Sequence, residues 1–310
     1  MKILVATEKP FAPVAIEKMK SIAGKKDFDL VLLEKYTEKS MLVEAVKDAD
    51  ALIIRSDKIG KEVFDEATKL KIVVRAGAGY DNIDLEAASD KEVVVMNTPG
   101  QNANAVAELA LGMMVYQIRN QFNGTAGTEL RNKKMGIHGY GHVGRITGMI
   151  ARGFGMVVSS YNPYISKIII ENDGVVYEDT VEGLYRGNQY ISVSLPLDDT
   201  TKGLVNYDLL SLMPPNAMLV NTARREVLDD ESLLKMFAER PDFQFISDIA
   251  PNCRPEIEKN YPGRYFFTPK KMGAQTAEAN INAGVAAAHQ VVDFLINGKN
   301  KFQVNQFNKT

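Results

Sequence analysis

The feature that most constrains this 310-residue chain is a glycine pattern near its middle. Gly139-Tyr140-Gly141-His142-Val143-Gly144 fits G-x-G-x-x-G, the turn that places a dinucleotide pyrophosphate at the N-terminus of a helix. A long segment with its own alternation of strands and helices precedes this turn. The pattern therefore predicts a dinucleotide-binding domain that begins in mid-chain.

The surroundings of this fingerprint agree with the prediction. An apolar run at Met135–His138 precedes it, and apolar residues recur at helical spacing over Ile146–Ile150. The next predicted strand, Met156–Ser160, ends close to Asn162. An acid is expected there to bind the ribose hydroxyls. Asparagine can bind them too but does not repel a 2′-phosphate, which leaves NADP open as the alternative. No arginine follows at once to hold a 2′-phosphate, although Lys167 is near, so we expect NAD.

Short apolar segments alternate with amphipathic ones along the whole chain, which is typical of parallel sheets covered by helices. The strands predicted before the fingerprint are Ile3–Ala6, Leu30–Leu33, Ala51–Ile54, Ile72–Val74 and Val93–Met96. Those predicted from it onward are Met135–His138, Met156–Ser160, Tyr190–Leu195, Met218–Asn221 and Phe243–Asp248. Amphipathic segments such as Ala15–Ile22 and Glu62–Leu70 separate the strands.

Two long helices, predicted from Ala103 to about Asn120 and from about Thr276 to Phe294, flank the second series of strands. This arrangement predicts that one domain is inserted into another. We expect an α/β protein with two Rossmann-like, doubly wound parallel-sheet domains. A discontinuous substrate-binding domain would comprise residues 1–98 and 285–310, and the dinucleotide-binding domain residues 99–284.

Composition excludes several classes of protein. Hydrophobic residues make up 45% of the chain and charged residues 25%, and the net charge of −2 comes without an extended basic run for nucleic acid or membrane. No apolar run reaches the ~18 residues of a membrane span. Met1–Ala6 is a strand pattern rather than a signal peptide, and Cys253 is the only cysteine. We expect a cytoplasmic protein without a metal.

Further polar segments lie at the ends of predicted strands or before long helices. Asn221–Arg224 follows a strand, and the Arg224 guanidinium can bind a carboxylate in a forked geometry. Arg75–Asp84 follows another, and its glycines free N–H groups to face an anion. Asn97–Asn102 and Thr268–Ala279 lead into the two long helices with N-cap signals.

In order and spacing, these segments and the fingerprint resemble the D-isomer-specific 2-hydroxyacid dehydrogenases. Within that superfamily the chain is most similar to short 3-phosphoglycerate dehydrogenases. The resemblance covers nearly the whole chain and implies hydride transfer between a nicotinamide cofactor and the 2-carbon of an anionic 2-hydroxy acid. The expected reaction converts 3-phosphoglycerate to 3-phosphohydroxypyruvate, the first step of phosphorylated serine synthesis. A homodimer or homotetramer, without the regulatory C-terminal domain of longer relatives, is also implied.

The resemblance also implies a catalytic arginine, glutamate and histidine. Arg224 matches the arginine, whereas Lys271 occupies the histidine position and Cys253 the glutamate position; Glu256 is the nearest acid. A lysine must be neutral to accept a proton. An adjacent carboxylate would raise the pKa of the lysine, and a nearby cation would lower it, so a lysine at the histidine position is consistent with the loss of the glutamate. We predict Lys271 as the acid/base. Lys270 is the other candidate, and substrate-anion binding is the alternative role.

The resemblance assigns the remaining contacts. Cofactor contacts are expected from Gly139, Gly141, His142, Val143, Gly144, Asn162, Leu195, Pro196, Thr222, Ala223, Asp248, Gly273, Ala274 and Ala78. Substrate contacts are expected from Arg55, Lys58, Arg75, Gly77, Ala78, Gly79 and Asn102. Glyoxylate, hydroxypyruvate or another D-2-hydroxy acid stays open as the substrate. A second alternative is a non-catalytic sensor of nicotinamide nucleotides, as in the corepressors of this superfamily.

Overall fold

The computed structural model describes residues 1–307, which fall into two compact units. Unit 1 comprises Met1–Asn102 together with the chain from Gln275 on, and unit 2 comprises Ala103–Ala274. Each unit is built on one sheet, of five strands in unit 1 and seven in unit 2. The predicted fold class is therefore confirmed. The domain limits predicted at 98/99 and 284/285 stay a prediction, since the compact units meet at 102/103 and 274/275.

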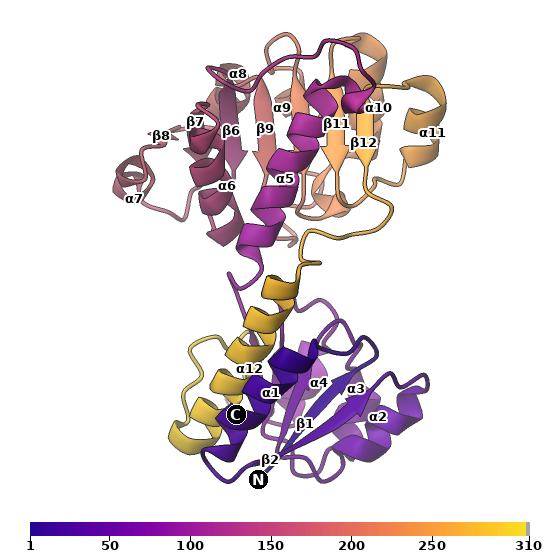
Figure 1. Cartoon of the computed structure of the whole chain (residues 1–310), viewed down its shortest axis with the longest axis vertical. Coiled ribbons are helices and arrows are strands. Elements are labelled where there is room, and N and C mark those ends of the chain that lie inside the picture. Colours follow the sequence, from indigo (N-terminus) through magenta and orange to yellow (C-terminus); the bar gives the residue numbers. More distant parts are fainter. Residues whose placement is uncertain (308–310) are drawn as a thin grey trace. The chain divides into compact units, whose positions relative to one another are not determined.

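Unit 1 has a parallel sheet of order β2-β1-β3-β4-β5 (Figure 1). Its strands are β1 (Lys2–Thr7), β2 (Asp29–Glu34), β3 (Ala51–Ile54), β4 (Ile72–Arg75) and β5 (Val94–Asn97). Its helices are α1 (Pro13–Gly24), α2 (Lys39–Val46), α3 (Lys61–Glu66), α4 (Leu85–Asp90) and α12 (Ala277–Asn297).

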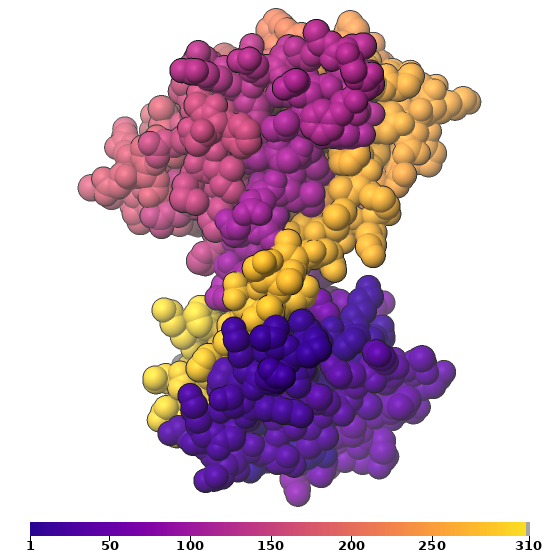
Figure 2. Space-filling view, in the orientation of Figure 1, coloured from indigo at the N-terminus to yellow at the C-terminus, as the bar shows by residue number. Residues whose placement is uncertain are grey.

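Alternation along the strands of unit 1 creates two cores. In β1, Ile3 and Val5 pack with α1 and α12, whereas Leu4 and Ala6 pack with α2, α3 and α4. Successive strand side chains point to opposite faces, so buried residues on both faces require helices on both. Figure 2 shows the C-terminal helix α12 in gold against the indigo N-terminal part of the same unit.

Unit 2 has a parallel sheet of order β12-β11-β10-β9-β6-β7-β8 (Figure 1). Its strands are β6 (Lys134–His138), β7 (Val157–Tyr161), β8 (Val176–Tyr177), β9 (Tyr190–Val193), β10 (Met218–Asn221), β11 (Gln244–Ser247) and β12 (Tyr265–Phe267). Its helices are α5 (Ala103–Ile118), α6 (His142–Gly153), α7 (Lys167–Asn172), α8 (Val181–Gly187), α9 (Tyr207–Leu210), α10 (Asp230–Glu239) and α11 (Arg254–Asn260).

The strand order of unit 2 reverses at β6. After β6 the chain continues to β7 on one side, and later returns to β9 on the other. Ligands of open α/β sheets bind beyond the carboxyl ends of the strands at such a switch point. The fingerprint begins at Gly139, directly after β6, so the topology places it at this position.

The long helix α5 is explained by its own unit. Ten of its sixteen residues are buried, among them Val106, Leu111 and Met114. It packs beside α6 and over β10, β11 and β12. Its apolar faces therefore need no partner chain to account for them, and they do not argue for an oligomer.

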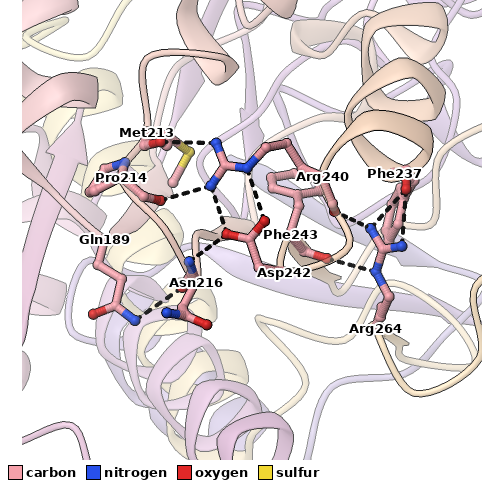
Figure 3. Close-up of polar contacts among 9 residues, drawn as sticks. All are labelled: Gln189, Met213, Pro214, Asn216, Phe237, Arg240, Asp242, Phe243 and Arg264. Carbon is pink, nitrogen blue, oxygen red and sulfur yellow. Dashed lines mark hydrogen bonds and ion pairs between the residues drawn. The ribbon is translucent and has the colours of Figure 1, made fainter.

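Two arginines fasten the edge of the unit 2 sheet where its strands begin (Figure 3). Arg264 donates to the carbonyl oxygens of Phe237 and Phe243 at 2.9 and 3.1 Å. Arg240 pairs with Asp242 at 2.7 Å and holds the pKa of that carboxyl at about 2. This edge of the sheet lies opposite the carboxyl ends of the strands. The network therefore stabilises the sheet without contacting the fingerprint turn.

Asn305 closes the free edge of the unit 1 sheet. Its side chain accepts from the Val95 N–H at 2.9 Å and donates to the Val93 carbonyl at 2.9 Å and the Ser89 hydroxyl at 3.1 Å. Val304 adds a main-chain bond to Val95. The segment thus satisfies backbone groups that an edge strand would otherwise expose.

We expect Asn305→Ala to destabilise unit 1 by about 2–4 kcal/mol, because it leaves the buried N–H of Val95 and carbonyl of Val93 unpaired. Urea unfolding measures this loss. Ser89→Ala is the comparison variant. It removes one bond to Asn305 and the bond from the Ser89 hydroxyl to the Leu85 carbonyl, but leaves the Val93 and Val95 groups paired, for a smaller loss of about 1 kcal/mol. Equal losses in the two variants would contradict the edge-closing role of Asn305.

Candidate active site

The fingerprint forms a tight turn between β6 and α6. Gly139 has φ +97°, and a Cβ there would lie 2.8 Å from the Ser194 carbonyl oxygen. A Cβ on Gly144 would lie 2.1 Å from the Gly139 carbonyl oxygen. A Cβ on Gly141 would meet nothing within 4 Å, and Gly141 as N-cap has no side chain to cap α6. The turn thus leaves open space in front of a helix N-terminus, which suits a phosphate.

The residues that flank the turn are anchored in the core. The Tyr140 hydroxyl donates to Asp173 at 3.1 Å, and Asp173 pairs with Arg145 at 2.6 Å. His138 is only 2% exposed, with its Nδ1 3.1 Å from the Tyr185 hydroxyl. Burial lowers the pKa of His138 to about 4. His138 is therefore a neutral core residue at physiological pH.

This buried histidine predicts a pH dependence of stability. An unfolded histidine titrates near pH 6.5. Because the folded pKa is lower, the unfolded chain binds the proton first, and stability falls as the pH drops from about 6.5 to about 4. His138 would contribute up to about 3 kcal/mol to this fall. Urea unfolding of His138→Gln at several pH values should give a shallower decline than wild type; an unchanged slope would contradict the assignment.

Asn162 directly follows β7 in a short turn. Its Oδ1 accepts from the Tyr164 N–H at 2.8 Å, so the amide oxygen orders the loop. Within residues 1–307 the Asn162 NH₂ group makes no hydrogen bond. This NH₂ group is therefore the part of the side chain that can donate a hydrogen bond to a ribose hydroxyl.

Buried polar atoms without partners lie at the carboxyl ends of β9 and β11, the two strands that flank β10. In the described residues, the Ser194 hydroxyl after β9 and Asp248 Oδ1 after β11 have no hydrogen-bond partner. Buried polar groups are normally satisfied by protein, water or ligand. Together with the open space at Gly141, these atoms fit a dinucleotide lying across this edge of the sheet.

Arg224 and Lys271 converge on one carbonyl group. Arg224 Nη1 donates to the Ala223 oxygen at 3.0 Å, and Lys271 Nζ lies 3.3 Å from the same oxygen. The Asn221 side chain braces this turn, accepting from the Ala223 N–H at 3.0 Å and donating to the Arg224 carbonyl at 2.9 Å. The two predicted catalytic cations, far apart in sequence, are therefore brought together.

Asp248 lies beside the same two cations. It is 1% exposed, and its Oδ2 accepts from the Gly273 N–H at 2.8 Å. Burial raises the pKa of Asp248, opposed by the Gly273 hydrogen bond and by the charges of Lys271 and Arg224. A Cβ on Gly273 would lie 2.8 Å from Asp248 Oδ2, so glycine is required where the Lys271 segment approaches Asp248.

A cleft of about 480 Å³ opens at this point of unit 2. Its lining residues are Arg225, Asp248, Ile249, Ala250, Pro251, Asn252, Arg254, Pro255, Thr268, Pro269, Lys270 and Lys271. Glu256 is exposed in the first turn of α11 and does not line the cleft. Cys253 is half-buried with Sγ 3.7 Å from Asp230, and burial raises its thiol pKa to about 12. Neither residue acts as a carboxylate partner for Lys271 here.

The other cofactor residues predicted in unit 2 lie at the same sheet edge. Leu195 Cδ2 would be 3.2 Å from a Cβ on Gly139, which places the turn after β9 against the fingerprint. The rest follow the ends of β6, β9, β10 and β12: His142, Val143, Pro196, Thr222, Ala223 and Ala274.

In unit 1 the predicted substrate residues follow β3 and β4. The half-buried Arg55 donates to the Lys9 and Pro10 carbonyls at 2.9 and 3.1 Å and to the Asn280 side chain, and burial lowers its pKa. The guanidinium of Arg55 thus bonds mainly to its own unit. Asn280, which lies in α12 and was not predicted from the sequence, accepts a hydrogen bond from this guanidinium.

The glycine loop after β4 is shaped by Arg75. Arg75 Nε donates to the Arg55 carbonyl at 3.0 Å, and a Cβ on Gly77 would lie 1.9 Å from Arg75 Nη1. The absence of a side chain at Gly77 therefore leaves room for the Arg75 guanidinium in its present position. Lys58 and Ala78 are exposed, and Gly79 and Asn102 are partly exposed.

Asp57 organises these loops and was not predicted. It is 4% exposed and accepts from the Glu8 N–H at 2.8 Å, the Tyr36 hydroxyl at 2.8 Å and the Arg55 N–H at 3.1 Å. It thereby ties together the segments that follow β1, β2 and β3. An acid directly after a buried strand was the signal for it in the sequence.

The model of the family "D-isomer specific 2-hydroxyacid dehydrogenase, catalytic domain" matches residues 4–305. The chain belongs to this family. It is similar to a crystal structure of NAD⁺-bound 3-phosphoglycerate dehydrogenase from Entamoeba histolytica, with a TM-score of 0.90, 47% identity and 99% of each chain covered. It is 33% identical to D-3-phosphoglycerate dehydrogenase of Methanocaldococcus jannaschii, over 82% of this chain and 51% of that protein. The chain thus spans about half the length of that relative.

A hydroxypyruvate reductase of Thermotoga maritima is also similar, at 29% identity over 85% of this chain and 90% of that protein. Relatives whose names give different substrates therefore match the chain over most of its length. Among residues 1–307, no helix is both long enough and apolar enough to span a membrane, and no three metal-ligating side chains form a cluster.

Proposed function

We propose that this chain is an NAD-dependent dehydrogenase that interconverts 3-phosphoglycerate and 3-phosphohydroxypyruvate. The observation that carries the proposal is the convergence of Arg224 and Lys271 on one carbonyl oxygen beside Asp248. The similarity to the Entamoeba histolytica enzyme supports the choice of substrate and cofactor. A reductase of glyoxylate, hydroxypyruvate or another 2-oxo acid is the alternative, supported by the similarity to the Thermotoga maritima protein.

In the proposed mechanism each cation has a separate role. Arg224 binds the substrate carboxylate through its forked guanidinium. Lys271 Nζ takes the proton of the 2-hydroxyl group in the oxidative direction and returns it in the reductive direction. NAD, when bound, accepts the hydride that leaves the 2-carbon. Asp248 positions the Lys271 segment through the Gly273 N–H.

Lys271 is favoured over Lys270 by its contacts. Lys271 Nζ is held near the Ala223 carbonyl and contributes to the electrostatics of buried Asp248. Lys270 is exposed, and within residues 1–307 its side chain makes no hydrogen bond or ion pair. A general acid/base must lie within hydrogen-bond reach of the proton that it transfers, and the contact with the Ala223 carbonyl gives Lys271 Nζ a defined position.

The proposed cofactor contacts follow from the geometry of the fingerprint edge. The N-terminus of α6 and the open space at Gly141 would hold the pyrophosphate. The Asn162 NH₂ group would donate to the ribose, and Asp248 Oδ1 lies where the nicotinamide end of the cofactor would extend. In unit 1, Arg55, Lys58, Arg75, Asn102 and the N–H groups of residues 77–79 are the proposed substrate contacts.

The family resemblance also supports a homodimer or homotetramer in the cytoplasm. The single thiol of Cys253, half-buried and unpaired, is compatible with a reducing compartment. Light scattering after size exclusion tests the oligomer: the expected mass is two or four times 34.3 kDa. A monomeric mass would overturn the oligomer and leave the catalytic proposal standing.

The test of the function is an absorbance assay of NADH with four 2-oxo acids: 3-phosphohydroxypyruvate, hydroxypyruvate, glyoxylate and pyruvate. We expect the highest kcat/KM with the phosphorylated acid, and NADH to be used better than NADPH. Preference for another acid would support the alternative reductase. Tight NADH binding without reduction of any acid would favour the non-catalytic sensor.

A further inference from the structure

We propose that unit 2 also binds NADPH, with the 2′-phosphate of this cofactor held by the loop of residues 161–167 through Asn162 and Lys167. The chain would then reduce its 2-oxo acid with either nicotinamide cofactor. The inference goes beyond the proposed function, because it adds a second cofactor and names the residues that would recognise it. It concerns cofactor binding alone and does not depend on which acid is the substrate.

The loop after β7 lies where a Rossmann-like domain recognises the adenosine ribose. The strand β7 pairs directly with β6, and the fingerprint follows β6. In such domains an acid near the end of the second strand bonds the ribose 2′-hydroxyl of NAD, whereas a nearby cation accommodates the 2′-phosphate of NADP. Here Asn162 directly follows β7. The carboxylate that would exclude NADPH is therefore absent from this position.

The contact with Tyr164 determines which end of the Asn162 amide is left for a ligand. Asn162 Oδ1 accepts from the main-chain N–H of Tyr164 at 2.8 Å. A main-chain N–H can only donate, so this contact fixes the amide oxygen toward the loop and excludes the flipped amide. The NH₂ group that remains can donate to a hydroxyl oxygen of NADH or to a phosphate oxygen of NADPH.

The charge of the loop favours a phosphate. Residues 161–167 contain one cation, Lys167, and no acid. Lys167 Nζ lies 3.8 Å from Glu171, and both side chains are at least half exposed. Exposed pairs of this kind contribute little, whereas a phosphate monoester carries roughly −1.5 to −2 at neutral pH. A 2′-phosphate can therefore compete with Glu171 for the lysine.

The acids that follow the neighbouring strand β8 make no bond to this loop. A Cβ on Gly183 would lie 3.3 Å from Glu178 Oε2, and one on Gly187 would lie 3.9 Å from Glu178 Oε1, so this carboxylate lies against α8. Asp179 is exposed, and water and salt screen its charge. Neither acid replaces the missing carboxylate at the end of β7.

Fluorescence titration with NADH and with NADPH tests the proposal without any 2-oxo acid. We expect a Kd for NADPH within about 10-fold of the Kd for NADH, because no carboxylate repels the 2′-phosphate and Asn162 donates to either group. A Kd for NADPH more than about 10-fold above that for NADH would overturn the proposal.

Asn162→Asp exchanges the NH₂ group for an anionic oxygen and keeps an oxygen for the Tyr164 N–H, so the loop should keep its fold. We expect the Kd for NADPH to rise about 10- to 100-fold and the Kd for NADH to stay the same or fall. Asn172→Asp is the matched control. It adds the same charge at an exposed residue of α7 and should leave the ratio of the two Kd values unchanged.

Thermal unfolding confirms that both variants are folded before their Kd values are compared. An unchanged ratio of the two Kd values in Asn162→Asp would overturn the proposal. An equal change of this ratio in Asn172→Asp would also overturn it, because the effect would then come from net charge and not from the end of β7.

Lys167→Gln tests the cation of the loop. We expect the Kd for NADPH to rise about 2- to 5-fold, in keeping with an exposed charge, and the Kd for NADH to stay the same. A loss of affinity shared equally by both cofactors, or no loss for either, would overturn the role of Lys167.

A failure of the proposed function would be recognised separately. If the protein binds NADH and NADPH with similar Kd values but reduces no 2-oxo acid, the dehydrogenase proposal fails and the second cofactor stands. If the protein reduces 3-phosphohydroxypyruvate with NADH but binds NADPH weakly, the second cofactor fails and the dehydrogenase proposal stands.

Discussion

Replacing Lys271 with methionine is expected to lower kcat for 3-phosphohydroxypyruvate by about 10²- to 10⁴-fold, the usual contribution of a positioned acid/base. NADH affinity should be retained, because Lys271 is not among the proposed cofactor contacts and lies away from the fingerprint turn at Gly139–Gly144. Steady-state kinetics and fluorescence titration of NADH measure the two effects. The exposed Lys259→Met serves as the control for loss of a lysine elsewhere.

Lys271→Arg separates proton transfer from anion binding. Arginine keeps the positive charge but does not titrate in the working range. If Lys271 is the acid/base, Lys271→Arg loses kcat almost as Lys271→Met does. Near-normal kcat in Lys271→Arg would instead assign Lys271 to substrate binding.

Gly141→Val is expected to weaken NADH binding by about 10- to 100-fold while leaving the fold intact. A Cβ at this position meets nothing within 4 Å in the protein, and Gly141 has φ −79°, which other residues adopt, so we expect the substituted chain to fold. It would occupy the space in front of α6 that we assign to the pyrophosphate. Calorimetry with NADH and thermal unfolding measure the two quantities.

Gly112→Ala is the matched control for this experiment. Gly112 is exposed in α5, and its added Cβ likewise meets nothing within 4 Å. NADH binding should be unchanged in this variant. Unchanged NADH affinity in Gly141→Val would show that the open space at the turn does not hold the cofactor.

The sequence predicted the fold well because both sheets are buried on both faces. All ten predicted strands are present. Continuous apolar runs such as Ala51–Ile54 are typical of parallel strands buried on both faces. The strands β8 and β12 were missed because they have only two and three residues. The amphipathic segment Glu62–Leu70 is helical only in its first part, because α3 ends at Glu66 and Ala67 has φ −83° and ψ 71°.

The site was less accessible to sequence reasoning. Arg224, Asp248 and Lys271 could be named because each follows a strand or precedes a long helix at a recognisable motif. Their convergence on the Ala223 carbonyl could not, because it depends on how neighbouring turns fold. The position of Arg254 in the lining of the cleft could not be predicted, because the sequence around Pro251 has no regular helix or strand pattern.

The roles of Glu256 and α5 show the limits of pattern reading. Glu256 is the nearest acid in sequence to the family glutamate position, yet the start of α11 leaves it exposed and outside the cleft. The apolar residues of α5 lie on more than one face of the helix, and the sheet and α6 of the same unit bury them. In both cases tertiary packing decides the environment of a residue that local sequence leaves open.

The central claim is that unit 2 supports hydride transfer to the 2-carbon of an anionic acid. Its most direct test uses NADH carrying two deuterium atoms at the nicotinamide C4, with 3-phosphohydroxypyruvate as the acid. Mass spectrometry and NMR of the product should find one deuterium atom at C2 of 3-phosphoglycerate. Product without deuterium at C2, or NADH that binds tightly without any turnover, would contradict the account.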